Sequence, residues 1–308
     1  MQPGKCNAAL EQLMAFSEDL VFNPTGRPLA GEELIQLLQD CEGYIAGLDF
    51  ITAEVMDACP KLKVISRYGV GYDRIDIQAA AERGIVVTNT PGVNAEAVGE
   101  MTFGLILAAA RQIPYLDRCT RQGEWIRSTG MELKGKTLGI MGLGAVGKVV
   151  ARCGQGLGMK VIAYDPSINA AYCWNNAIDI VSREKLITDS DVITLHLPLS
   201  AETYHLINTD SFAAMKRGMI LINVAHGGLI DEEAAYEALK NGRLGGLGLD
   251  AFETEPPEHS RLFEFSNVVA TPHAAAHTKE AMQDMAQMAV SDLIAVLSGK
   301  DCLHIVNK

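Results

Sequence analysis

Short apolar runs alternate with amphipathic stretches along the whole chain, a pattern typical of repeated strand–helix units. In the first part of the chain, buried strands are expected at 44–46, 64–66 and 85–88, with a further strand candidate at 19–22. Helices are expected there over 7–16, 31–39, 53–58 and 75–83. Strands at 137–141, 159–164, 192–197, 219–224, 244–250 and 268–271 continue the alternation. The pattern predicts an α/β protein with parallel sheets, and no first strand is evident before residue 7.

The clearest local pattern follows the strand expected at 137–141. Gly142, Gly144 and Gly147 have the G-x-G-x-x-G spacing. In that spacing the glycines allow a tight turn, a close approach of pyrophosphate to the backbone, and close packing of the next helix. The next strand ends at Asp165, about 20 residues on, where an acidic residue binds the ribose hydroxyls of a dinucleotide. Strand, glycines, helix, strand and aspartate in this order predict an NAD site, because a carboxylate would repel the 2′-phosphate of NADP.

Composition and charge indicate the number of domains, the class of partner and the location of the protein. The 308 residues suggest about two domains, and the net charge of −12 without a Lys/Arg run argues against a nucleic-acid or anionic-membrane partner. The longest apolar stretch, 101–110, is too short to span a bilayer. Seven scattered cysteines without a C-x-x-C pair, and no secretory signal, favour a reducing cytoplasmic location.

Ligands of open α/β sheets bind outside the carboxyl ends of the strands. The polar residues expected there are candidates for binding or chemistry: Asp165, His196, His226, Asp250, Glu255 and His273. The segment 67–73 interrupts the pattern with two glycines beside a strand end, which indicates either backbone close to a ligand or an ordinary loop. A long helix expected over 94–111 is rich in small residues, which permit close helix packing within a domain or across a dimer.

These motifs together resemble the D-isomer-specific 2-hydroxyacid dehydrogenases, and within that family the short forms of phosphoglycerate dehydrogenase. The likeness covers nearly the whole chain and rests on segments 67–73, 142–165, 196–199, 222–228, 250–256 and 271–273. It implies two domains with doubly wound parallel sheets. An NAD-binding Rossmann domain, 95–280, would be inserted in a discontinuous flavodoxin-like substrate domain formed by 1–94 and 281–308.

The resemblance also implies ligands and contacts. NAD is the implied cofactor, a small 2-hydroxy or 2-keto acid is the implied substrate, and no metal is implied. A homodimer through the cofactor domain is implied as well, with the helix at 94–111 and the segment around Trp125 at the contact. The implied cofactor contacts are Val70, Gly142, Gly144, Ala145, Val146, Gly147, Asp165, Leu197, Val224, Ala225, Asp250, His273 and Ala276. The implied substrate contacts are Arg67, Val70, Gly71 and His226.

Reduction of a 2-keto acid needs a hydride donor, a general acid for the carbonyl oxygen and a cation for the carboxylate. The resemblance implies that His273 is the acid and base, a role that suits imidazole near neutral pH. Glu255 is implied to orient the ring and to stabilise its charged form. Without the resemblance, a structural histidine and a solvated glutamate are the ordinary interpretations of these two residues.

One departure from the family pattern concerns His226, which stands between Ala225 and Gly227 where the family carries arginine. That arginine grips the substrate with a planar fork, whereas a neutral imidazole supplies one donor and no charge. A slow enzyme, a different substrate, and an arginine-to-histidine variant are three interpretations that the sequence leaves open.

The sequence therefore predicts an NAD-dependent oxidoreductase that interconverts a small D-2-hydroxy acid and its 2-keto acid, with a phosphoglycerate-like substrate as the first expectation. The alternative is an NAD(H)-binding sensor or interaction protein with little turnover. Retention of His273 and Glu255 favours the enzyme, and His226 favours the alternative.

Overall fold

The computed structural model describes residues 7–308, and these form two compact units. The first unit ends at Asn94 and is completed by His277–Lys308, and the second is Ala95–Ala276. Both contain a parallel sheet with helices, which confirms the predicted fold class. The return to the first unit precedes the position expected from the sequence. A boundary at 280 falls inside helix α12 (Lys279–Leu297), and this whole helix packs on the first unit's sheet.

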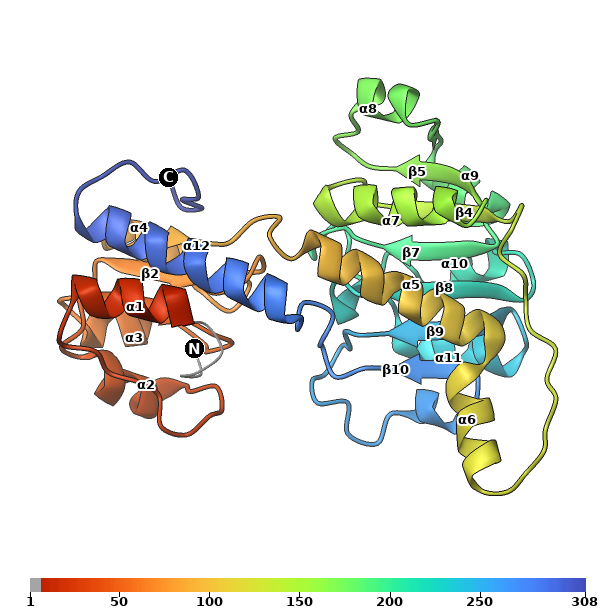
Figure 1. Cartoon of the computed structure of the whole chain (residues 1–308), viewed down its shortest axis with the longest axis horizontal. Coiled ribbons are helices and arrows are strands. Elements are labelled where there is room, and N and C mark those ends of the chain that lie inside the picture. Colours follow the sequence, from red (N-terminus) through yellow and green to blue (C-terminus); the bar gives the residue numbers. More distant parts are fainter. Residues whose placement is uncertain (1–6) are drawn as a thin grey trace. The chain divides into compact units, whose positions relative to one another are not determined.

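The first unit is built on a three-stranded parallel sheet in the order β1 (Gly43–Ala46), β2 (Val64–Arg67), β3 (Val86–Thr88). Alternate residues of β1 face opposite sides, because Ile45 packs with Ala286 and Val290 of α12 whereas Ala46 packs with Leu34 and Val55. α12 and α1 (Asn7–Phe16) therefore cover one face (Figure 1). The other face is covered by α2 (Gly31–Leu38), α3 (Ala53–Ala58) and α4 (Ile77–Glu82).

The prediction of a strand at 19–22 is wrong. This segment has no strand conformation, and the side chains of Val21 and Phe22 are 64% and 42% exposed. A strand needs a partner for its backbone groups, and the segment lies in an irregular connection between α1 and α2. The apolar run is too short to distinguish a strand from a loop that carries exposed apolar residues.

The second unit is built on a seven-stranded, all-parallel sheet in the order β10-β9-β8-β7-β4-β5-β6. The chain starts in the middle of the sheet with β4 and reverses its direction of growth between β4 and β7. Such a reversal separates the connecting loops and opens a crevice at the carboxyl ends of the strands, where dinucleotides bind. The strands are β4 (Thr137–Met141), β5 (Lys160–Tyr164), β6 (Asp179–Ile180), β7 (Val192–Leu195), β8 (Met219–Asn223), β9 (Leu244–Leu249) and β10 (Val268–Ala270).

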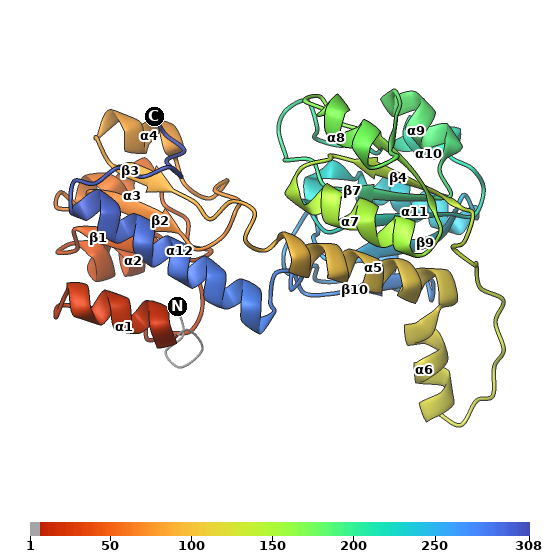
Figure 2. The same cartoon turned by 45° about the horizontal axis from the view of Figure 1, so that its top comes forward.

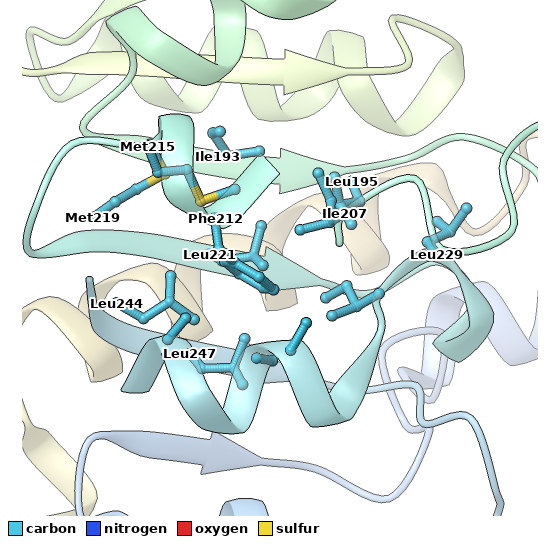
Figure 3. Close-up of a cluster of buried hydrophobic side chains, with 14 of the residues drawn as sticks. Ile193, Leu195, Ile207, Phe212, Met215, Met219, Leu221, Leu229, Leu244 and Leu247 are labelled. Carbon is cyan, nitrogen blue, oxygen red and sulfur yellow. The ribbon is translucent and has the colours of Figure 1, made fainter. Parts of the chain in front are cut away.

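Helices cover both faces of this sheet and bury two apolar clusters. Figure 3 shows one cluster, in which Ile193 of β7 and Leu221 of β8 lie near Phe212. The helices on that face are α9 (Arg183–Asp189), α10 (Thr209–Ala214) and α11 (Glu232–Lys240). The opposite face carries α5 (Ala95–Arg111) and α7 (Ala145–Gly156). The remaining helical segments of the unit are α6 (Ile113–Arg121), α8 (Ala170–Asn175), η1 (Gly227–Leu229) and η2 (Arg261–Glu264).

One of the small residues of α5, Gly99, acts within the unit. A Cβ atom added to Gly99 would lie 2.4 Å from Cγ1 of Val149 on α7, a distance that real side chains do not reach. Glycine at this position therefore sets the spacing between the two helices that cover this face of the sheet.

The segment after α5 differs from its sequence-based interpretation. No helix is expected from the sequence between 111 and 137, but α6 follows α5 and projects from the unit together with an extended return segment that carries Trp125 (Figure 2). Only Cys119 of α6 is buried, and the Trp125 side chain is 81% exposed. Helices are usually identified in a sequence by a broad apolar stripe, which is the face that they bury. Because α6 buries a single residue, it lacks this signal.

Within residues 7–308, no helix is both long and apolar enough to cross a membrane. Cys6 lies outside this range, and the other six cysteines are free thiols. The same residues contain no cluster of three or more His, Cys, Asp or Glu side chains that could hold a metal ion.

Candidate active site

The glycine loop between β4 and α7 forms a cradle whose shape depends on its glycines. Gly142 has a φ of +97°, and an added Cβ would lie 2.7 Å from the carbonyl carbon of His196. A Cβ on Gly147 would lie 2.1 Å from the carbonyl oxygen of Gly142. Gly144, in contrast, is exposed and has no atom within 4 Å of its added Cβ, so the space above it is open. The loop can therefore admit a phosphate group beside the N-terminal amides of α7, where Ala145 is exposed and Val146 is half-buried.

Asp165 follows β5 and lies against this cradle. Its Oδ2 accepts a hydrogen bond from the amide of Leu143 at 2.7 Å, and its Oδ1 accepts one from the amide of Ser167 at 2.7 Å. A carboxylate has about four acceptor positions, so two remain for the hydroxyls of a ribose. The donor and acceptor chemistry of the loop and of Asp165 fits a dinucleotide without a 2′-phosphate.

His273 and Glu255 form the predicted pair. Nδ1 of His273 lies 2.8 Å from Oε1 and 3.0 Å from Oε2 of Glu255. The amide of Phe252 also donates to Oε1 at 3.3 Å, which holds the carboxylate in place. With Nδ1–H directed at Glu255, the opposite nitrogen, Nε2, is the one that can exchange a proton with a ligand. The His273 side chain is half exposed, so a ligand can reach it.

Asp250, at the end of β9, holds the loop that carries His273. Its side chain is fully buried. It accepts hydrogen bonds from the Thr271 hydroxyl at 2.5 Å and from the amides of Ala274 and Ala275 at 2.8 Å each. The three donor residues lie before and after His273 in the sequence, so Asp250 fixes the loop on both sides of it. His273 itself has a φ of +49°, a conformation that a non-glycine residue adopts only when its surroundings impose it.

The turn after β8 brings His226 close to the segment that carries Glu255. Buried Asn223, the last residue of β8, accepts a hydrogen bond from the amide of Ala225 at 3.1 Å and donates one to the carbonyl of His226 at 2.8 Å. The next residue, Gly227, touches the segment that leads to Glu255. A Cβ added to it would lie 1.9 Å from the carbonyl carbon of Phe252. His226 is thus fixed, through its backbone, next to the segment that positions Glu255.

In the first unit, the segment 67–71 forms a compact loop after β2. Nε of Arg67 donates to the carbonyl of Gly71 at 2.8 Å, and Nη1 donates to the carbonyl of Tyr68. The guanidinium therefore braces its own loop, and burial lowers the pKa of Arg67. The Val70 side chain is 39% exposed, so the top of the loop faces solvent.

His196, the first residue after β7, lies behind the glycine loop. Its Nε2 lies 2.9 Å from the hydroxyl of Thr194, and burial lowers its pKa to about 3. This imidazole is therefore neutral at physiological pH, and it is a structural residue rather than a proton donor.

The predicted residues of the second unit meet at one edge of its sheet. The glycine loop, Leu197, Val224, Asp250 and the loop of His273 follow β4, β7, β8, β9 and β10, which are parallel neighbours. Leu197 and Val224 are buried, and Ala225 and Ala276 are half-buried. Arg67, Val70 and Gly71 lie at the carboxyl end of β2 in the other unit.

Three residues that shape these loops were not identified from the sequence. Asn223 and Thr271 hold the turns of His226 and His273, and Asn89 donates to the carbonyl of Val70 at 2.8 Å. A polar residue within or directly after an apolar strand is the signal that could have identified Asn89 and Asn223, because buried polar groups need partners.

Comparison with known proteins agrees with this geometry. The family model for the NAD-binding domain of D-isomer-specific 2-hydroxyacid dehydrogenases matches residues 103–275. A glyoxylate reductase of Thermofilum pendens is 44% identical over 97% of this chain and 91% of that protein. A D-3-phosphoglycerate dehydrogenase of Methanocaldococcus jannaschii is 41% identical over 91% of this chain, which spans only 54% of that protein.

A solved structure supports the same relationship. The D-lactate dehydrogenase of Aquifex aeolicus, solved with NAD and lactic acid, superposes with a TM-score of 0.83 at 28% identity. The match covers 97% of this chain and 94% of that one. The chain therefore belongs to the D-isomer-specific 2-hydroxyacid dehydrogenases and is an NAD-dependent oxidoreductase of that family.

Proposed function

We propose that the protein interconverts a small, unphosphorylated D-2-hydroxy acid and its 2-keto acid, with His273 as the acid and base. The observation that carries the proposal is the His273–Glu255 pair, held at 2.8 Å on a loop that the buried Asp250 anchors. A general acid must be oriented before the substrate arrives, and this loop achieves that with hydrogen bonds alone.

The side chains of the site suggest the role of each residue in the reaction. The glycine loop and Asp165 would hold NADH, which would be the source of the hydride for the carbonyl carbon of the keto acid. His273 donates the Nε2 proton to the carbonyl oxygen, and in the reverse direction it removes the hydroxyl proton. Glu255 fixes Nδ1–H and stabilises the imidazolium by its opposite charge. Asp250, which the resemblance makes a cofactor contact, is fully buried and already accepts three hydrogen bonds, so its role in this proposal is to hold the loop of His273.

The backbone amides of the loop 67–71 are proposed to bind the substrate carboxylate. Arg67 is one of the substrate contacts that the resemblance implies, and a phosphoglycerate-like substrate would need a cation for its phosphate. The guanidinium of Arg67 instead bonds to Gly71 and Tyr68, and the neighbouring Arg74 donates to the carbonyl of Leu48 at 3.1 Å. Both guanidinium groups have donors engaged with backbone carbonyls, and on this ground we favour a substrate of the size and charge of glyoxylate. A glyoxylate reductase among the similar proteins supports this choice.

The test is NADH oxidation with glyoxylate, hydroxypyruvate, pyruvate and 3-phosphohydroxypyruvate. The proposal predicts a higher kcat/KM for glyoxylate or hydroxypyruvate than for the phosphorylated acid. Preference for 3-phosphohydroxypyruvate would show that Arg67 or Arg74 releases its backbone partners to bind phosphate.

One observation supports a second possible function. His226 replaces the arginine that the family resemblance places at the substrate, which favours an NAD(H)-binding protein with little turnover. Tight NADH binding without oxidation by any of the four acids would support that function over the first.

We also propose a homodimer formed through the second unit. The projecting α6 and the segment that follows it expose Ile113, Trp125 and Ile126, whose side chains are 52%, 81% and 41% exposed. Exposed apolar side chains on a projecting segment are typical of a protein interface. Light scattering on the purified protein should give the mass of a dimer, and Trp125→Ser should weaken the dimer. A monomeric wild type would reject this assembly.

A further inference from the structure

The carboxyl-terminal residues of the chain pair with the sheet of the first unit. After α12, residues 302–307 run beside β3 in the antiparallel direction, with a bridge between Thr88 and Ile305 (Figure 2). The amide of Val306 donates to the carbonyl of Val87 at 2.9 Å. Asn307 closes the pairing, because its side chain bonds to the amide of Val87 at 2.8 Å and to the carbonyl of Ile85 at 2.7 Å.

His304 fixes the start of this pairing. Its Nδ1 lies 2.9 Å and 3.1 Å from the two carboxylate oxygens of Asp292 on α12. Asp292 is only 7% exposed, so the interaction is shielded from solvent on the carboxylate side. Charged and polar groups in such surroundings keep their partners, because an unpaired buried carboxylate is costly. The backbone of His304 is therefore held against α12.

A second set of hydrogen bonds leads from His304 to the loop 67–71. The carbonyl of His304 accepts a hydrogen bond from the amide of Asn89 at 3.3 Å. The side chain of Asn89 donates to the carbonyl of Val70 at 2.8 Å. Next to it, the amide of Thr90 donates to the carbonyl of Gly69 at 3.0 Å. Asn89 is 8% exposed and so has little freedom to move independently of its partners.

We propose that His304 is a positioning residue for the substrate, acting through Asp292 on one side and through Asn89 and Val70 on the other. The inference rests on the proposed function, in which the amides of the loop 67–71 bind the substrate carboxylate. His304 does not touch the substrate. It sets the position of Asn89, and Asn89 sets the orientation of the peptide group that carries the Val70 carbonyl.

The loop is fixed unevenly along its length. Tyr68 packs against the cluster of Ala286 and Val290, and its hydroxyl donates to the carbonyl of Met282 at 3.0 Å. Val70 is 39% exposed, so apolar packing contributes little at the tip of the loop, and the hydrogen bond from Asn89 acts there. Arg67 braces the loop from inside through the carbonyl of Gly71. Backbone donors bind an anion well only when they are already aligned, since alignment after binding lowers the affinity. Loss of the hydrogen bonds through Asn89 should therefore weaken substrate binding more than it slows the chemical step.

Three variants separate the parts of this proposal. His304→Ala removes the contact to Asp292. His304→Asn keeps an amide donor close to the position of Nδ1 and is the conservative variant. Leu303→Ala is the control, because the Leu303 side chain is 87% exposed and belongs to the same segment.

Steady-state kinetics with glyoxylate gives the first measurement. In His304→Ala, KM should rise by about three- to tenfold while kcat and the NADH dissociation constant stay within about twofold of wild type. His304→Asn and Leu303→Ala should keep the KM of wild type. A purely structural role would lower the melting temperature without this selective change in KM, and an unchanged KM in His304→Ala would overturn the proposal.

Hydrogen exchange gives a second measurement that does not depend on turnover. The peptide covering 67–73 should exchange faster in His304→Ala than in wild type, with a peptide covering β1 as the internal reference. Equal exchange of 67–73 in both proteins would also overturn the proposal. If wild type reduces none of the keto acids, the proposed function fails, while faster exchange in the variant would still establish the link from His304 to the loop.

Discussion

The amide of Leu143 donates a 2.7 Å hydrogen bond to Oδ2 of Asp165, so the residue proposed to bind the ribose also holds the glycine loop. Cofactor choice and loop structure are therefore coupled in this protein. We expect NADH to bind at least about tenfold more tightly than NADPH, because the carboxylate repels the additional phosphate. Titration of both cofactors by tryptophan fluorescence tests this.

The coupling has a further consequence for Asp165→Ser. This change should weaken NADH binding, but it should not produce tight NADPH binding, since the Leu143 amide loses its charged acceptor and the loop loses part of its support. Equal affinity of wild type for both cofactors would show that Asp165 is not at the ribose.

Asp250 is predicted to determine both stability and turnover. In Asp250→Ala the amides of Ala274 and Ala275 and the Thr271 hydroxyl lose their acceptor in a buried place. The free energy of unfolding should fall by about 3 kcal/mol, and kcat should fall because His273 is no longer held. Urea denaturation and steady-state kinetics give the two values. Asp210→Ala, at an exposed position of α10, should change the free energy of unfolding by less than about 0.5 kcal/mol.

His196 is predicted to make the protein sensitive to acid. Its pKa is lowered from 6.5 to about 3 by burial, so the folded protein keeps this imidazole neutral while the unfolded chain protonates it. Its contribution to stability is complete above pH 6.5 and is lost as the pH falls toward 3, with a slope of about 1.4 kcal/mol per pH unit. His196→Gln should reduce the pH dependence of the free energy of unfolding by that amount between about pH 6 and pH 4. An identical pH dependence in both proteins would show that burial does not change the pKa of this ring on folding.

His226 is predicted to limit turnover. An arginine there restores a planar, charged fork, so His226→Arg should raise kcat/KM for glyoxylate by about ten- to hundredfold, the contribution of one charge-assisted hydrogen bond. NADH affinity should change little, because the buried Asn223 continues to hold the backbone of the turn. His259→Arg, at an exposed turn, is the control for added charge. A variant no faster than a slow wild type would favour the NAD(H)-binding function.

The sequence predicts the second unit well because its signals are local. The strand of β4 and the glycine spacing each lie within a few residues, and parallel strands bring their carboxyl ends to one edge. Asp165, Asp250 and the loop of His273 can therefore be placed together from the amino-acid pattern alone. The pair of His273 and Glu255 is expected from the family resemblance, and the fold brings the two side chains to a distance of 2.8 Å.

Other features depend on contacts that no local pattern encodes. Arg67 looks like a ligand for an anion in the sequence, but it bonds to carbonyls of its own loop. The strand candidate at 19–22 has apolar residues but no partner strand, and α6 buries only one residue, so it needs no broad apolar stripe. The links from Asp292 to His304 and from Asn89 to Val70 join residues distant in the sequence, so they appear only in the folded chain.

The central claim, proton transfer by His273, is tested most directly by single-turnover reduction of glyoxylate with enzyme-bound NADH in wild type and His273→Ala. The account predicts that the rate of NADH oxidation falls by at least about a hundredfold, the usual contribution of a positioned general acid, while the NADH dissociation constant stays the same. Near-normal NADH oxidation by His273→Ala would contradict it.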